Sequence, residues 1–152
     1  MKKILLSLTL IIALYSLAEA QTKPYLNLVD AQRITAAATK KAKVEGWNVV
    51  IVILDDGGNL ISLQRMDGVQ VGSIEVAQAK AKSAVFFKRP TKTFEDAMKA
   101  EGGARIATLP NAVGVEGGLP IFKNGVIVGA IGVSGVTSAQ DGIIAAAGID
   151  KY

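Results

Sequence analysis

The chain has 152 residues and a formal net charge of +4 at pH 7, and 50% of its residues are hydrophobic. It contains no cysteine and no histidine, which excludes disulfide bonds, thiolate and imidazole catalysis, the common serine triad, and the usual ligand sets for zinc and copper. Because the lysines are scattered and only 5% of residues are aromatic, the sequence offers neither a clustered basic face nor a stacking platform for nucleic acid.

Residues 1–20 have the pattern of a cleaved signal peptide. Two lysines precede an apolar run over residues 4–17, and Ala18-Glu19-Ala20 is a small-x-small motif of the kind that signal peptidase cleaves after. The apolar run is shorter than the roughly 20 residues that span a bilayer, although an uncleaved membrane anchor is the alternative. We therefore expect residues 21–152 to form a single domain that is periplasmic or extracellular, without stable membrane insertion after cleavage.

The first part of this domain predicts a helix followed by a hairpin. Asn27 is a candidate N-cap, small and apolar residues follow at helical spacing, and Gly46 ends the helix. Residues 48–54 are rich in β-branched side chains and predict a strand that is covered on both faces. A turn at residues 55–59 leads back into a second strand over residues 60–66.

Two helices are expected next. The first begins at Ser73 as N-cap and runs to about Phe87, and a capping motif at residues 93–96 predicts a second, short helix toward Lys99. Three alanines form a narrow stripe that lets the first helix approach a sheet closely: Ala77, Ala81 and Ala84. Three lysines are expected on its polar side: Lys80, Lys82 and Lys88.

The last part of the chain predicts a second hairpin and a final helix. Residues 119–122 form a strand that tolerates Pro120 only at its start or on a sheet edge, and Asn124-Gly125 favours a type I′ turn. A strand over residues 126–133 and a helix over about residues 138–147 follow. Two tight hairpins imply an antiparallel sheet with helices packed on it, so the predicted fold class is α+β.

The segment Gly129–Gly135, GAIGVSG, has a glycine at every third position. A phosphate-binding loop would need a preceding parallel strand or a following lysine, and the chain has neither here, so no nucleotide site is expected. Strand alternation places Ile127 and Ile131 on one face, whereas the opposite face begins with Val126 and Val128 and becomes small toward Ser134. A small face makes room for a helix, a neighbouring subunit or a flat ring.

Four segments in a fixed order resemble a known family: VVIVILDDGGNLISLQRMDG, AQAKAKSA, VEGGLPIFKNGVIVGAIGVSG and QDGIIAAAG. They are similar to the GlcG/HbpS-like family of heme-binding and heme-degradation-associated proteins, over about residues 29–148. The resemblance implies a profilin-like sandwich, in which helices flank an antiparallel five-stranded sheet, and a homo-oligomer. It also implies heme as a cofactor.

This chain departs from family members that ligate heme iron through histidine. Without that residue, the axial candidates are a lysine, a hydroxyl, or one of four side chains: Met66, Met98, Tyr25 and Tyr152. For Met66, packing in the core of the sheet is the alternative to ligation.

Four places in the sequence are candidates for a site that binds a small anionic molecule. Arg65 could bind a carboxylate in bidentate fashion, or only pair with Asp67. Lys80 could turn inward to a carboxylate, or remain a solvated surface lysine. Glu116, Gly117 and Gly118 place a carboxylate beside two unobstructed amides, and an irregular turn is the alternative interpretation; Asp141 is a weaker companion.

Three functions are consistent with these residues. The first is an exported small-ligand-binding protein that holds heme or a related tetrapyrrole, with Arg65 and Lys80 on its propionates. The second is a cofactor-independent enzyme that acts on small unsaturated or oxo carboxylic acids, with Glu116 and Asp141 as catalytic acid/base candidates. The third is an oligomeric scaffold or sensor partner without a ligand of its own.

Overall fold

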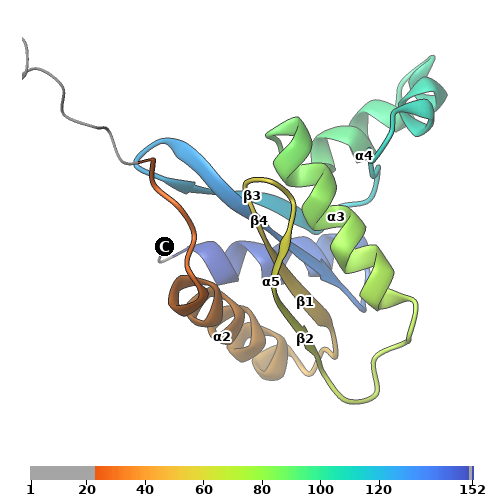
Figure 1. The fold of residues 1–152 in the computed structure, drawn as a ribbon. Helices are drawn as coiled ribbons and strands as arrows, with labels where there is room; N and C mark the ends of the chain where they lie inside the picture. The colour runs from red at the N-terminus through yellow and green to blue at the C-terminus, as the bar shows by residue number, and fades with distance from the viewer. Residues whose placement is uncertain (1–22, 151) are drawn as a thin grey trace, which may run out of the picture.

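The computed structural model describes residues 23–150 and 152, and the signal peptide predicted for residues 1–20 lies outside the described residues. Helices lie on both faces of an antiparallel sheet with strand order β2-β1-β4-β3 (Figure 1). This confirms the predicted α+β class. Within the described residues, no helix is long and apolar enough to cross a membrane.

The elements follow one another in the predicted order, with one addition. Their bounds are α2 Leu28–Glu45, β1 Val50–Asp55, β2 Leu60–Arg65, α3 Ser73–Phe87, α4 Thr91–Lys99, the 3-10 helix η1 Gly103–Thr108, β3 Gly118–Lys123, β4 Val126–Ser134 and α5 Ser138–Ile149. The five-stranded sheet implied by the family resemblance is wrong for the described residues, which contain four strands. The long connection from β2 to β3 supplies no further strand, because it is built from α3, α4 and η1.

The sheet separates two apolar cores, because successive side chains of its central strand β1 point to opposite faces. On one face, Ile51 and Ile53 pack with α2 and α5, which contribute Ile34 and Ile144 among other buried residues. On the other face, Val50 and Val52 pack against the alanines of α3. Each fully buried isoleucine or valine contributes about 1.5–3 kcal/mol to folding, so β1 anchors both layers.

The glycines of β4 make room for the backbone of neighbouring elements. A Cβ atom at Gly132 would collide with the carbonyl oxygen of Ala77 and would lie 2.7 Å from the amide nitrogen of Ala81. Of the three occupants that the sequence left open, this position therefore accommodates a helix, α3. The predicted faces of Ile127 and Val128 are wrong, because the β3–β4 register shifts beside them: Val128 packs in the α2 side core and Ile127 against the α3 side core.

Helix ends and turns follow local chemistry in most places. Asn27 caps α2 by accepting a hydrogen bond from the Asp30 amide, and Gly46 ends that helix in the left-handed conformation, both as predicted. Asn124 and Gly125 have φ angles of 53° and 76°, as a type I′ turn requires. The edge position expected for Pro120 is confirmed, since β3 is the last strand of the sheet.

Two predicted helix starts are wrong. Ser73 is the first residue of α3 and not its N-cap, which is Gly72, and the buried Ser73 hydroxyl has no hydrogen-bond partner. Helix α4 begins at Thr91 after Pro90, two residues before the motif that predicted it. Proline fixes the backbone angle φ near −65° and favours an extended residue before it, so the chain turns at this point.

Candidate functional site

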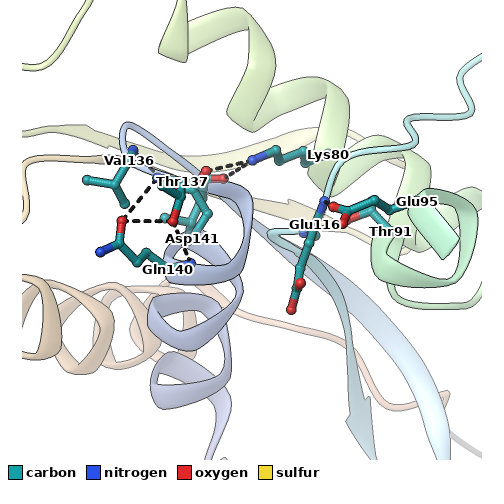
Figure 2. A network of polar contacts seen from close by, with 10 residues as sticks. Lys80, Thr91, Glu95, Glu116, Val136, Thr137, Gln140 and Asp141 are labelled. Carbon is teal, nitrogen blue, oxygen red and sulfur yellow. Dashed lines mark hydrogen bonds and ion pairs between the residues drawn. The ribbon is translucent and has the colours of Figure 1, made fainter. Parts of the chain in front are cut away.

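Lys80 and Asp141 form a buried ion pair between α3 and α5 (Figure 2). Lys80 Nζ lies 2.7 Å from Asp141 Oδ2 and donates a second hydrogen bond to the carbonyl oxygen of Val133 at 3.1 Å. The two side chains are 1% and 2% exposed. The predicted polar-side position of Lys80, and with it the interpretation as a solvated lysine, is therefore wrong.

Small residues provide the space for this lysine. A Cβ atom at Gly117 would lie 2.9 Å from Lys80 Nζ and 2.9 Å from Asp141 Cβ, so the glycine leaves the volume that the pair fills. Asp141 Oδ1 also accepts a hydrogen bond from the Val136 amide at 3.3 Å. Burial raises the pKa of Asp141, and the hydrogen bond and positive charge of Lys80 oppose that rise.

The first turn of α5 explains why Asp141 is free to turn inward. Two overlapping capping boxes fit the sequence here, and the structure forms the one between Thr137 and Gln140. Because those side chains satisfy the helix start, Asp141 caps nothing of its own helix and can turn toward Lys80. Lys80 and Asp141 neutralise each other, so neither can hold an external ligand unless the pair is broken.

The amides at residues 116–118 are largely occupied by side chains of α4. The Glu116 amide donates to Glu95 Oε2 at 2.8 Å, and the Gly118 amide donates to Thr91 Oγ1 at 3.0 Å. The hydrogen bond from the Glu116 amide has the largest effect in lowering the pKa of Glu95, and the hydrogen bond from Lys99 has the next largest. An external anion could bind these amides only by displacing the hydrogen bonds that they already make.

Glu116 does not face Asp141 across a common cavity. Its carboxylate lies over Gly142 of α5, where a Cβ atom would lie 2.8 Å from Glu116 Cγ. Figure 2 shows the Glu116 carboxylate pointing away from the Lys80 ammonium group. The two acid/base candidates therefore do not form a joint catalytic pair in this structure.

Arg65 lies apart from the buried pair. It is exposed at the end of the edge strand β2, with β1 between that strand and β4, and its guanidinium donates to the carbonyl oxygen of Val69 at 3.2 Å. The alternative ion pair with Asp67 is not among the ion pairs of the described residues. The four sequence candidates are thus not brought together in one pocket.

A different group of residues forms a concave surface of about 570 Å³ at the end of the molecule where both hairpin turns lie. We call it the hairpin-end concavity and define it by its lining residues: Lys23, Asp56, Val85, Lys88, Phe122, Gly125, Val126 and Ile127. The last turn of α3, the turns after β1 and β3, and the segment before α2 all contribute to it.

The hairpin-end concavity combines an apolar surface with positive charge. Phe122 and Val126 are 50% and 41% exposed, so their apolar surfaces are available to a ligand. Lys88 is held at φ 54°, a left-handed conformation that few residues other than glycine adopt. Lys23 is ion-paired with Asp56, whereas no acidic group of the described residues lies within ion-pair distance of Lys88.

Four other concave surfaces, which lie along α2 and α3, lack this combination, because none of them has an aromatic lining residue. None is lined by Glu116 or Asp141. The described residues also contain no group of three or more acidic side chains that could hold a metal ion.

Sequence reasoning missed the hairpin-end concavity, although part of its signal was present. Phe122 is an aromatic residue on a strand next to a strong turn motif, and the Pro120 rule already favoured a sheet edge for that strand. What the sequence does not contain is the meeting of that turn with the end of α3, which depends on the packing of α3 over β4 and β3.

The chain is similar to proteins of known sequence and structure. Residues 26–150 match a family model described as haem degrading protein HbpS-like. Protein GlcG of Escherichia coli (strain K12) is 39% identical over 114 residues, which cover 75% of this chain and 84% of that protein. The crystal structure of a PduOC:heme complex superposes with a TM-score of 0.76 at 29% identity, over 84% of this chain and 94% of that one. The crystal structure of HbpS superposes with a TM-score of 0.77 at 29% identity, over 86% and 92%.

Proposed function

Because this chain belongs to the HbpS-like family, we propose that it binds heme or a related tetrapyrrole, and that the ligand sits in the hairpin-end concavity. The observation that carries the proposal is the similarity over most of the chain to a domain whose structure was solved with heme bound. The fold alone does not identify a ligand, because proteins with the same fold have many different functions. The local chemistry of the concavity supplies the second support.

The hairpin-end concavity fits two chemical features that heme and protoporphyrin share. A porphyrin presents a flat apolar ring, and the exposed ring of Phe122 with the side chain of Val126 offers an apolar surface for it. Both molecules also carry propionate carboxylates, and the ammonium group of Lys88 is a cation without an acidic neighbour in the described residues. Lys23 lines the same surface and is ion-paired with Asp56.

The buried Lys80–Asp141 pair has a supporting part in this proposal. It fixes α3 to the start of α5 and to the end of β4, through Asp141 and the Val133 carbonyl. Because α3 ends at Phe87 and Lys88 follows directly, the position of Lys88 depends on how α3 is held. Lys80 is therefore assigned to positioning and not to ligand contact, and Arg65 to a separate surface.

We also propose that the protein is exported through residues 1–20 and that it self-associates. The support for export is the signal-peptide pattern of the sequence, and the support for self-association is the family resemblance. Cell fractionation with N-terminal sequencing of the mature chain tests the first, and the native mass of the purified protein tests the second. A mature chain that retains residues 1–20 would contradict cleavage.

Titration with hemin tests the proposed function. The purified chain that begins at residue 21 is expected to give a saturable shift of the hemin Soret band, with one hemin per chain and a dissociation constant on the order of micromolar. Bovine serum albumin and buffer alone serve as the positive and negative controls. A spectrum identical to that of hemin in buffer at every protein concentration would refute the proposal and would favour a scaffold or sensor partner without its own ligand.

A further inference from the structure

The residues of the hairpin-end concavity can contact a tetrapyrrole ring and its carboxylates, but none of them provides a ligand for iron. Resting on the proposed function, we infer that this protein recognises the tetrapyrrole ring and its carboxylates independently of the metal. Metal-free protoporphyrin and hemin then bind at the same site with the same affinity.

Histidine and cysteine, two common protein ligands of heme iron, are absent from the whole chain. The remaining protein ligands of heme iron to consider first are the thioether of methionine and the phenolate of tyrosine. The sequence has three methionines and three tyrosines, of which Met1 and Tyr15 fall in the predicted signal peptide. Four such side chains belong to the described residues: Tyr25, Met66, Met98 and Tyr152.

None of these four lines the hairpin-end concavity. Met98 lies against Gly114, and Met66 packs beside the α2 side core. The Tyr152 hydroxyl donates to Asp30 Oδ2 at 3.2 Å, and burial raises the pKa of that hydroxyl, which keeps it protonated at neutral pH. Both methionines and Tyr152 are therefore committed to contacts elsewhere in the fold.

The polar side chains that do line the concavity are suited to carboxylates and not to iron. Lys88 and Lys23 present ammonium groups, which attract carboxylates and have no lone pair to donate to iron. The carboxylate of Asp56 is ion-paired with Lys23. No serine, threonine, methionine or tyrosine completes the lining.

Affinity should therefore come from interactions that do not involve the metal. Stacking on Phe122, burial against Val126 and attraction to Lys88 are the same for hemin and for protoporphyrin IX, because the two molecules share the ring and both propionates. Bound hemin should also keep its axial positions open to a small added ligand. These two consequences can be measured independently of any enzymatic activity.

Parallel titrations with hemin and protoporphyrin IX test the inference, with absorbance for the first and porphyrin fluorescence for the second. The expected result is a pair of dissociation constants that agree within about threefold. Imidazole added to the protein–hemin complex should convert its spectrum to that of bis-imidazole or imidazole-ligated heme. Each porphyrin should displace the other in competition.

Two phenylalanine variants locate the site in the same experiment. Phe122→Ala should weaken both porphyrins by a similar factor of about tenfold, since it removes the stacking surface. The matched control is Phe86→Ala, an exposed aromatic residue of α3 that lies over Gly58 and does not line the concavity. It should leave both affinities unchanged. Circular dichroism checks that each variant is folded.

The possible outcomes separate the inference from the function on which it rests. If neither porphyrin binds, the proposed function fails. If hemin binds and protoporphyrin IX binds at least about tenfold more weakly, the metal is recognised and the inference is overturned while the function stands. A complex whose spectrum already shows a strong-field axial ligand, and does not respond to imidazole, would overturn it in the same way.

Discussion

Lys80 lies in the middle of helix α3 and Lys88 directly follows the end of that helix, and these two lysines have opposite environments. Lys80 is 1% exposed and bonded to Asp141, whereas Lys88 is exposed and has no acidic neighbour in the described residues. They are eight residues apart, about two helical turns, so spacing does not distinguish them. The difference shows that the packing of a helix against its sheet decides whether a charge serves the fold or remains available to a ligand.

Close backbone packing is what encloses Lys80. In the middle of α3, the backbone of Ala77 and Ala81 packs directly against Gly132 of the sheet. Because the helix lies so close to the sheet, the Lys80 side chain between them has no path to solvent. At the end of α3, Lys88 is the C-cap in a left-handed conformation, and its side chain is exposed.

Removal of one partner of the buried pair should cause the largest loss of stability. Asp141→Ala leaves the Lys80 ammonium buried without its counter-charge, which costs about 3–5 kcal/mol. Urea unfolding followed by circular dichroism measures the change in the free energy of unfolding. The control is Asp96→Ala, which breaks an exposed pair with Lys92 and should change stability by less than about 1 kcal/mol.

The double variant Lys80→Met with Asp141→Leu sharpens that result. Replacing both charges by apolar side chains removes the desolvation cost together with the attraction, so most of the stability lost in Asp141→Ala should return. A double variant as unstable as Asp141→Ala would show that packing volume, and not the stranded charge, explains the loss.

The close approach of α3 to the sheet should be the next most sensitive feature. Gly132→Ala places a methyl group against the Ala77 carbonyl and should cost at least about 1–3 kcal/mol through overpacking. Gly72→Ala is the matched control, because a Cβ atom there has no neighbour within 4 Å. Equal thermal unfolding midpoints for the two variants would contradict the close packing described for α3.

Acid should weaken the contact between α4 and the loop that precedes β3. The pKa of Glu95 lies below its ordinary value of 4.5, because its carboxylate accepts the Glu116 amide and the Lys99 ammonium. The folded state therefore binds this proton less tightly than the unfolded state, so the stabilisation is present above pH 4.5 and is lost as pH falls through the folded pKa. Glu95→Ala should lower stability by about 1 kcal/mol at neutral pH and show a smaller acid-side loss than the wild type.

The experiment for Glu95 is a series of urea unfolding curves for both proteins between about pH 3 and pH 7. Convergence of the two stabilities at the acid end is the expected result. Parallel curves with a constant gap would show that the carboxylate contributes nothing that depends on its charge.

Most of the fold could be predicted from local sequence patterns. Both hairpins, the caps of α2 and the alanine stripe of α3 follow from residue chemistry within a few positions, and the structure has them where they were expected. The starts of α3 and α4 were misplaced because a serine or threonine near a helix start fits several frames equally well. The 3-10 helix at residues 103–108 has no periodic signal of its own.

The site could be predicted much less well, because it depends on contacts between distant parts of the chain. A lysine between alanines is typical of a helix surface, and only Asp141, 61 residues away, makes its burial possible. The glycines at residues 117 and 118 predict open backbone amides. The side chains of α4 that bond to the amides of residues 116 and 118 are too far away in the sequence for a local pattern to reveal them. The hairpin-end concavity arises from four separate segments.

The most direct test compares the lysine at the end of α3 with a neighbour outside the proposed site. Hemin titrations are carried out on the wild type, on Lys88→Gln and on Lys82→Gln, an exposed lysine of the same helix that lies near Phe86 and not in the hairpin-end concavity. We expect Lys88→Gln to weaken hemin binding by about two- to fivefold, the range of one exposed charge pair, and Lys82→Gln to leave it unchanged. Identical binding curves for all three proteins would contradict the account, because hemin would then bind without the cation that defines the site.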